Sequence, residues 1–285
     1  MDREKLSDGA FSVVYLVRDE KDVVLKECDY TSPETKKHVD REQQTYERLG
    51  KHPHIVTLFK VDDDTKDGKK RIWLERMFTD VQTFISFGYR FDAIRYIMRG
   101  IFRGLAHLHR LQLIHCDLKP ANVLIQLSTS DHVMAGVKLC DFGMVHDMKE
   151  TITNWYIQTR YYRSPEVCNK HEVFGPAIDL WSAGCILAEL ITKEYLFGGT
   201  HSNREALEAI VHEFGPCGLI MASTFEDDPS LRGRRLQKVK DKLEAEPLRD
   251  VCMDLLHRLL TVRPSERITA EEALRHPLFD GFTYE

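Results

Sequence analysis

The sequence lacks the features that mark several common classes of protein. Its seven cysteines are odd in number and include no CxxC pair, so neither a disulfide framework nor a zinc site is indicated. The most apolar run, at 181–191, is short and contains Glu189, and the N-terminal MDREKLSDG is charged. We therefore expect no membrane span and no signal peptide, and we expect an intracellular protein of the cytoplasm, the nucleus or both.

Charge of one sign is not in large excess either. The 285 residues include 40 lysines and arginines and 45 aspartates and glutamates, which gives a formal net charge of −5. This balance provides no global attraction to nucleic acid or to anionic lipid, so we expect neither as a partner, and we expect a monomer. One basic run, RGRRLQKVKDK at 232–242, has two readings: a docking patch, or a solvated face of mixed charge.

No internal repeat, low-complexity tract or long linker divides the chain. Strand-like apolar runs lie at 11–17, 22–26, 55–59 and 71–75. The capping sequence Ser-Pro-Glu at 32–34 predicts one helix among them, which runs to about Leu49. From Arg90 onward helical periodicity dominates. The sequence therefore predicts an α+β protein whose sheet-rich and helix-rich parts meet near residues 75–80.

The densest group of chemically active residues is HCDLKPANVL at 115–124. It places Asp117, Lys119 and Asn122 in one short segment, and CDFG follows with Asp141, 24 residues after Asp117. This set is the equipment for transferring the γ-phosphoryl group of a nucleoside triphosphate, with the second aspartate placed to hold a metal.

In these motifs and in their order, the sequence resembles the eukaryotic protein kinases over residues 6–279. The resemblance implies a single catalytic domain over residues 1–285 with the bilobal kinase fold. A small antiparallel β-sheet lobe with one helix, together with the hinge, would take residues 1–77. A larger, mainly α-helical lobe would take residues 78–285.

The resemblance also implies roles in the reaction. Asp117 would accept or orient the proton of the attacking hydroxyl, and Lys119 would neutralise the charge that develops on the transferred phosphoryl group. Asn122 and Asp141 would bind Mg²⁺, an ion that prefers oxygen ligands. ATP and Mg²⁺ are therefore the expected cofactors.

A lysine and a glutamate of the sheet-rich part complete this set. Lys26 in VVLK would contact the α- and β-phosphates of ATP, and Glu42 would fix its ammonium group. Glu47 is a competing acid on the same predicted helix, but Glu42 keeps the family's spacing to Leu49.

The nucleotide-binding loop departs from the family pattern. Kinases usually have three glycines there, whereas LSDGAFSVVY at 6–15 keeps only Gly9 and has Ser7 and Ser12 at the outer positions. Serine is small enough to approach phosphate closely, but it lacks the positive-φ freedom of glycine. The further residues expected around the adenine are Val14, Val24, Leu74, Glu75, Met77 and Leu124.

The segment NWYIQTRYYRSPEV at 154–167 indicates the class of substrate. Thr159, together with Lys119, matches the serine/threonine kinases, so protein substrates with serine or threonine acceptors are expected. Arg160 matches an arginine of the CMGC group, which shapes the pocket after the acceptor so that proline is accepted.

Within that group the segment most closely resembles the dual-specificity tyrosine-regulated kinases (DYRK). Tyr156 matches the tyrosine that those kinases autophosphorylate, and Arg160 and Arg163 lie nearby in sequence as possible partners for a phosphate. Cys116, where most kinases have arginine, is shared with the DYRK relatives. Without that arginine, one usual anchor for an activation-loop phosphate is missing, so we expect less dependence on an upstream kinase.

Three further residues are expected to be structural. Glu166 would form a buried salt bridge with Arg267, which ties the activation segment to the helical lobe. Asp179 would brace the backbone of the catalytic loop.

Two other functions remain open. Ser7, Ser12 and Cys116 are compatible with a pseudokinase that acts as a nucleotide-binding scaffold, although the catalytic residues are intact. A small-molecule phosphotransferase with the same core would not need the RYYRSPE segment. Cys140 also has two readings, an alkylable thiol that faces the nucleotide or a buried inert one.

Overall fold

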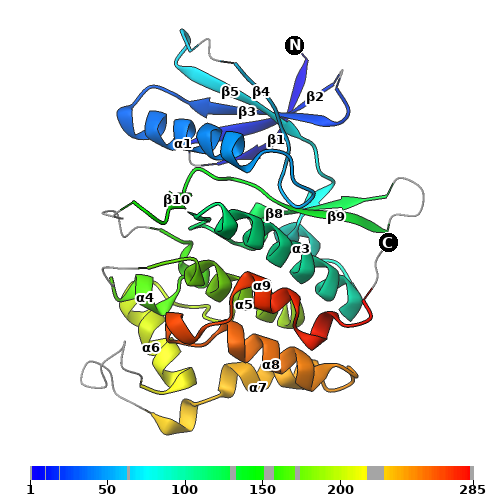
Figure 1. Cartoon of the computed structure of the whole chain (residues 1–285), viewed down its shortest axis with the longest axis vertical. Coiled ribbons are helices and arrows are strands. Elements are labelled where there is room, and N and C mark those ends of the chain that lie inside the picture. The colour runs from blue at the N-terminus through cyan, green and yellow to red at the C-terminus, as the bar shows by residue number, and fades with distance from the viewer. Residues whose placement is uncertain are drawn as a thin grey trace.

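The computed structural model describes residues 2–9, 11–18, 20–62, 65–128, 133–150, 157–170, 174–216 and 228–282. An antiparallel sheet and one long helix form the first part of the molecule, and a stack of helices forms the second (Figure 1). The sheet has the strand order β1-β2-β3-β5-β4. Its strands are β1 (Arg3–Asp8), β2 (Ser12–Val17), β3 (Val23–Asp29), β4 (Leu58–Asp62) and β5 (Lys69–Glu75). The predicted α+β class is confirmed.

Helix α1 (Pro33–Leu49) has the bounds that the capping sequence predicts. The Ser32 hydroxyl accepts a hydrogen bond from the backbone N–H of Thr35, and the Thr35 side chain accepts one from the Ser32 N–H. Pro33 occupies the first turn, where a missing N–H costs nothing. Local chemistry therefore fixes where this helix starts, and its buried face carries Glu42 toward the sheet.

The predicted strand at 55–59 is displaced toward the C-terminus, because β4 begins only at Leu58. Ile55 instead forms an isolated bridge with Leu139, and the backbone N–H of Val56 donates to the Leu139 carbonyl. Both side chains are buried. The apolar character of this run thus comes from contact with the strand that precedes Asp141, a contact that strand periodicity does not predict.

The helical part surrounds α5 (Ala177–Thr192), whose residues from Ile178 to Leu190 are all buried. A helix that is apolar on every side belongs at the centre of a core, and Figure 1 shows other helices packed around it. Those in contact with α5 include α3 (Phe91–Arg110), α7 (Arg234–Lys242) and α8 (Arg249–Leu259). The other helices are α2 (Val81–Phe84), α4 (Pro165–Cys168), α6 (Asn203–Phe214) and α9 (Ala270–Leu274). No helix in the described ranges is long and apolar enough to cross a membrane.

Two small sheets lie between the two parts. One has the order β6-β8-β9, and the other pairs β7 with β10. Their strands are β6 (Thr79–Asp80), β7 (Leu113–Ile114), β8 (Val123–Leu127), β9 (Met134–Leu139) and β10 (His146–Asp147). The segment 115–122 therefore leaves β7 and enters β8, and the segment 140–145 leaves β9 and enters β10. Both motif loops are held at each end by strands.

Glycines of α3 let this helix approach β9 closely. A methyl group on Gly100 would lie 2.5 Å from Cβ of Val137, and one on Gly104 would lie 2.7 Å from Cδ1 of Leu139. Because α3 is packed this tightly, it fixes the position of β9 and of the Asp141 loop that follows.

We expect Gly100→Ala to lower the free energy of unfolding by about 1–3 kcal/mol, because the added methyl group overlaps the branched β-carbon of Val137 and outweighs the gain in helix propensity. Gly136→Ala is the matched control. Its nearest neighbour would be Cβ of Gln126 at 3.7 Å, so its stability should stay within about 0.5 kcal/mol of wild type. Urea denaturation of both variants checks this, and equal stability of the two would contradict it.

Candidate functional site

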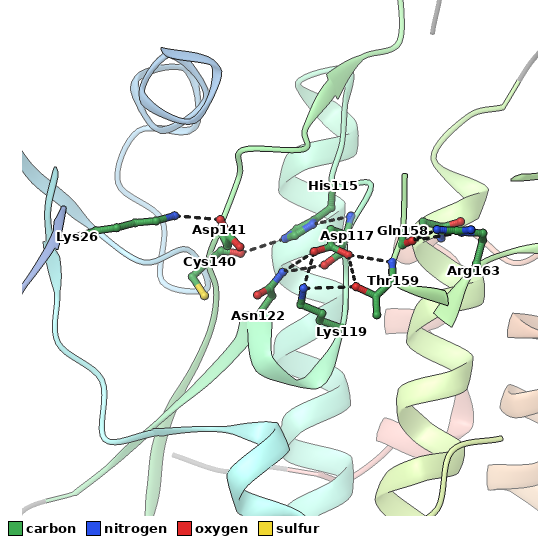
Figure 2. Close-up of polar contacts among 10 residues, drawn as sticks. All are labelled: Lys26, His115, Asp117, Lys119, Asn122, Cys140, Asp141, Gln158, Thr159 and Arg163. Carbon is green, nitrogen blue, oxygen red and sulfur yellow. Dashed lines mark hydrogen bonds and ion pairs between the residues drawn. The ribbon is translucent and has the colours of Figure 1, made fainter. Parts of the chain in front are cut away.

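The lysine and glutamate predicted from separate motifs form an ion pair between β3 and α1. Nζ of Lys26 lies 2.6 Å from Oε1 and 2.8 Å from Oε2 of Glu42, and it also lies 3.0 Å from Oδ1 of Asp141. Figure 2 shows Lys26 pointing at Asp141. The first part of the molecule is thereby joined electrostatically to the loop after β9, and Glu42 rather than Glu47 makes this contact.

The three charges of this trio do not all benefit, because burial, helped by the Asp141 carboxylate, outweighs Lys26 and raises the pKa of Glu42. The Lys26 ammonium group lowers the pKa of Asp141 to about 2. Burial opposes the charged form of Lys26, but the carboxylates of Asp141 and Glu42 outweigh burial and raise the pKa of Lys26. At neutral pH, Lys26 is therefore a fixed cation and Asp141 a fixed anion.

The catalytic-loop residues converge on one carboxylate. Nζ of Lys119 donates to Oδ2 of Asp117 at 2.7 Å, and Nδ2 of Asn122 donates to the Asp117 backbone carbonyl at 2.8 Å. Asn122 is in the short 3₁₀ turn η1 (Pro120–Asn122) and is nearly fully buried. The sequence order Asp, Lys, Asn thus becomes a compact cluster (Figure 2).

Thr159 closes this cluster from the activation segment. Its hydroxyl donates to Oδ1 of Asp117 at 2.7 Å, its backbone N–H donates to the same oxygen at 3.0 Å, and Nζ of Lys119 lies 3.4 Å from its hydroxyl oxygen. Thr159 was predicted as a site residue, but its two hydrogen bonds to Asp117 were not, because the two residues are 42 positions apart.

Gln158, which sequence reasoning did not single out, has left-handed backbone with φ of 58°. Its carbonyl oxygen is turned toward Arg163, whose Nη2 and Nε donate to it at 2.7 Å and 3.2 Å. The Gln158 side chain is buried, donates to Oγ of Ser182 and accepts from the N–H of Ser164. No local sequence signal marks this conformation, because glutamine rarely adopts positive φ.

The structure thus gives the two activation-segment arginines different positions. Arg163 is buried and also donates to the Ile157 carbonyl, whereas Arg160 is half-buried and contributes a favourable charge near Glu205. Arg163 therefore holds the two backbone carbonyls just before Thr159, those of Ile157 and Gln158, whereas the role of Arg160 in the pocket after the acceptor stays a prediction. Tyr156 lies outside the described residues.

The buried carboxylate of Asp179 holds the backbone of the catalytic loop by hydrogen bonds, as predicted. Oδ2 of Asp179 accepts from the backbone N–H of His115 at 2.9 Å and from Nε2 of His109 at 2.9 Å, and Oδ1 accepts from the N–H of Cys116 at 3.1 Å. Cys116 itself is buried with φ of 62°.

The nucleotide loop accommodates its serines without backbone strain. Ser7 belongs to β1 and Ser12 to β2, and neither has positive φ. Gly9 donates its N–H to the Ser12 carbonyl at 2.8 Å, and its φ is not positive either. The reduced freedom of serine therefore has no consequence for this turn.

The apolar residues predicted around an adenine share one cluster. Val24 and Leu74 are buried, and Val14, Met77 and Leu124 pack against the same cluster. Within the described ranges, the backbone of Met77 makes no hydrogen bond and is available to a base.

The hinge is anchored by a contact that sequence reasoning missed. Nζ of Lys138 lies 2.6 Å and 2.8 Å from the two carboxylate oxygens of Glu75, and the N–H of Thr57 donates to Oε2 at 3.0 Å. Lys138 outweighs the effect of burial and lowers the pKa of Glu75. The side chain of Glu75 is thus occupied by the protein, and its backbone N–H donates to the Thr57 carbonyl at 2.9 Å, which leaves the Glu75 carbonyl as the group for the nucleotide.

Asn122 and Asp141 offer a donor set that fits Mg²⁺. The amide nitrogen of Asn122 is engaged by Asp117, which leaves its oxygen for a cation, and only one oxygen of Asp141 contacts Lys26. The part of the chain that the structure describes contains no cluster of three or more His, Cys, Asp or Glu side chains suited to a metal. A small set is nevertheless sufficient, because Mg²⁺ is usually held by one or two protein groups together with substrate phosphates and water.

Cys140 is only partly buried, so its thiol meets only one condition of the inert reading and both readings stay open. Its backbone carbonyl accepts from Nε2 of His115 at 3.2 Å, and burial raises the pKa of its thiol. A raised pKa keeps the thiol protonated at neutral pH and poorly nucleophilic.

The predicted pair of Glu166 and Arg267 is present and fully buried. Nη1 and Nη2 of Arg267 lie 2.7 Å and 3.1 Å from the two carboxylate oxygens, and the guanidinium also donates to the carbonyls of Ala177, Thr261 and Val262. A buried pair with this many hydrogen bonds is stable as a unit, but it leaves a costly charge when one partner is removed.

Arg267→Ala should therefore lower the free energy of unfolding by about 3–5 kcal/mol, since Glu166 would be left buried and unpaired. Arg275→Ala is the control, because the Arg275 side chain is three-quarters exposed and its ion pair with Glu271 is long, at 3.7 Å. This substitution should change the free energy of unfolding by about 0.5 kcal/mol or less. Chemical denaturation provides the measurement. A loss below about 1 kcal/mol for Arg267→Ala would refute a structural role for the pair.

Comparison with known proteins agrees with the geometry. Mitogen-activated protein kinase 15 of Xenopus laevis is 30% identical over 98% of this chain and 50% of its own length. Mitogen-activated protein kinase HOG1 of Gibberella zeae is 31% identical over 96% of this chain and 77% of its own length. The chain spans about half the length of the mitogen-activated protein kinase 15 relatives.

Among solved structures, a chain of the CAK complex from Chaetomium thermophilum bound to ATP-gamma-S superposes with a TM-score of 0.78 at 26% identity, over 99% of this chain and 92% of that one. The relatives named are mitogen-activated protein kinases of the CMGC group, so the closer likeness to DYRK stays a prediction. The protein kinase domain family matches residues 1–279. The predicted bilobal fold is confirmed, and the chain belongs to the protein kinase family.

Proposed function

We propose that this chain is an ATP-dependent protein kinase that transfers the γ-phosphoryl group to serine or threonine of protein substrates. The observation that carries the proposal is the simultaneous assembly of two clusters. Lys26 is paired with both Glu42 and Asp141, while Asp117 is bonded to Lys119 and Thr159. A protein that only bound nucleotide would not need the second cluster.

The chain's own residues divide the work of the reaction. Lys26, held by Glu42, binds the α- and β-phosphates, and the cluster of apolar residues at the hinge receives the adenine. Asp117 orients the attacking hydroxyl, and Lys119 stabilises negative charge on the phosphoryl group in transfer. Mg²⁺, held by Asn122 and Asp141, would neutralise phosphate charge.

Asp117→Asn should lower kcat by about 10²- to 10⁴-fold, because the amide cannot accept the hydroxyl proton. Asp141→Asn should lose a comparable amount, because it removes the anion that Lys26 faces. Asp92→Asn, a surface change beside Arg95, is the control and should retain wild-type activity. Transfer of labelled phosphate to a peptide library measures all three. No transfer by wild type would leave the scaffold function instead, and transfer by Asp117→Asn equal to that of an active wild type would overturn the role of Asp117.

We further propose that the residue after the acceptor is preferably proline. The support is the Gln158 carbonyl, which is bonded to Arg163 at 2.7 Å and so is not presented to a substrate. A substrate residue that carries an N–H would leave this donor unpaired when it docks beside Thr159. Proline has no N–H and avoids that cost.

Three peptides that differ only after the acceptor test this reasoning. Proline and N-methylalanine should give similar kcat/KM values, because both lack the N–H, and alanine should be about 5- to 150-fold worse. If N-methylalanine behaves like alanine, proline is selected by ring shape and the N–H argument is wrong.

Several finer assignments belong to the same proposal. The lobes are assigned to residues 1–77 and 78–285, and the enzyme acts as a monomer inside the cell. A DYRK-like enzyme would also autophosphorylate Tyr156, which rests on the sequence alone.

A further inference from the structure

His38 lies on the inward face of α1, one helical turn before Glu42. Residues four apart share a helix face, so the imidazole of His38 and the carboxylate of Glu42 both point at the site. His38 is half-buried, and among the described residues it makes no hydrogen bond. The ring is therefore held by packing.

The first group that this ring packs against is the backbone after Asp141. A methyl group on Gly143 would lie 2.1 Å from Nε2 and 2.3 Å from Cε1 of His38. The imidazole thus fills the space beside the Gly143 α-carbon, where any other residue would place its side chain. It limits movement of the turn that carries Asp141.

The second group is the tip of the nucleotide loop. The rings of His38 and Phe11 have centroids 5.6 Å apart and planes tilted by 54°, a favourable arrangement for aromatic rings. Phe11 is otherwise substantially exposed, at 44% of its surface. One side chain of α1 therefore touches both the loop that covers the phosphates and the turn that carries the proposed metal ligand.

We propose that His38 is a positioning residue for ATP, which holds the tip of the nucleotide loop and the Asp141 turn at a fixed separation. The proposal rests on the proposed function, and it concerns the same site. In the nucleotide loop Ser7 and Asp8 pair with Val14 and Val13 as in an ordinary hairpin, and this pairing does not set the distance between the loop and the Asp141 turn. The ring contact between Phe11 and His38 supplies an anchor that depends on side chains instead.

The expected kinetic signature is a selective loss of ATP binding. His38→Ala and His38→Asn should each raise KM for ATP by about 3- to 10-fold, because both remove the ring. KM for the peptide should stay within about twofold of wild type, because His38 is proposed to act on ATP alone. A merely structural defect would reduce the amount of active enzyme and leave KM for ATP unchanged. Lys37→Ala, next in sequence and exposed, is the control and should match wild type.

A double-mutant cycle with Phe11 identifies the contact. Phe11→Ala should raise KM for ATP as His38→Ala does, and the double variant should be no more than about twofold worse than the worse single variant, because both changes remove one interaction. Fully multiplicative effects would show that the two rings act separately and would overturn the proposal. So would wild-type KM in His38→Asn, which would assign the role to polarity.

Calorimetric titration with Mg·ATP separates this inference from the proposed function. The affinity of His38→Ala should fall by the same factor as KM rises. If wild type transfers no phosphoryl group but this loss of affinity is observed, the proposed function fails and the role of His38 stands. If wild type is active and the affinity of His38→Ala is unchanged, the role of His38 fails alone.

Discussion

The active arrangement depends on one buried carboxylate, that of Asp179 in the central helix α5. A buried charge is costly unless it is hydrogen-bonded, and Asp179 accepts from the ring of His109 and from the backbone N–H groups of His115 and Cys116. These bonds hold Cys116 in left-handed backbone, which a cysteine adopts only when its surroundings require it. The backbone conformation of Cys116 in turn sets the direction of the next residue, Asp117. Without the Asp179 carboxylate, the catalytic loop would lose its two backbone hydrogen bonds to the central helix.

Hydrogen bonds connect Cys116 and Asp117 to the activation segment. Thr159 bonds the Asp117 carboxylate twice, and the N–H of Gln158 donates to the Cys116 carbonyl at 2.8 Å. The two segments are thus joined at successive residues, and the Gln158 carbonyl is free to turn away toward Arg163. The residues proposed to carry out transfer and those proposed to select the residue after the acceptor consequently belong to one hydrogen-bonded unit. A change in either should disturb both.

The sequence predicted what short motifs encode and missed what distant segments create. Helix α1 was predicted with its bounds because its cap is local, and Lys26, Glu42 and Asp141 were predicted because each is in a motif of fixed order. The β4 strand was misplaced because burial against Leu139 imitates strand character. The carbonyl of Gln158 could not be predicted, since its direction is decided by a buried guanidinium five residues away.

Cys116 contributes to the activation segment by packing, without the positive charge of the arginine that most kinases have at this position. An arginine at this position would reach toward a phosphate, whereas the cysteine is fully buried and packs in an apolar cluster with Ile157 and Val167. The activation segment is instead fixed by Thr159 at one end and by the Glu166–Arg267 pair at the other. All of these contacts are internal and already satisfied. These contacts hold the described part of the segment without a phosphate, which supports the expectation that activity depends less on phosphorylation by an upstream kinase.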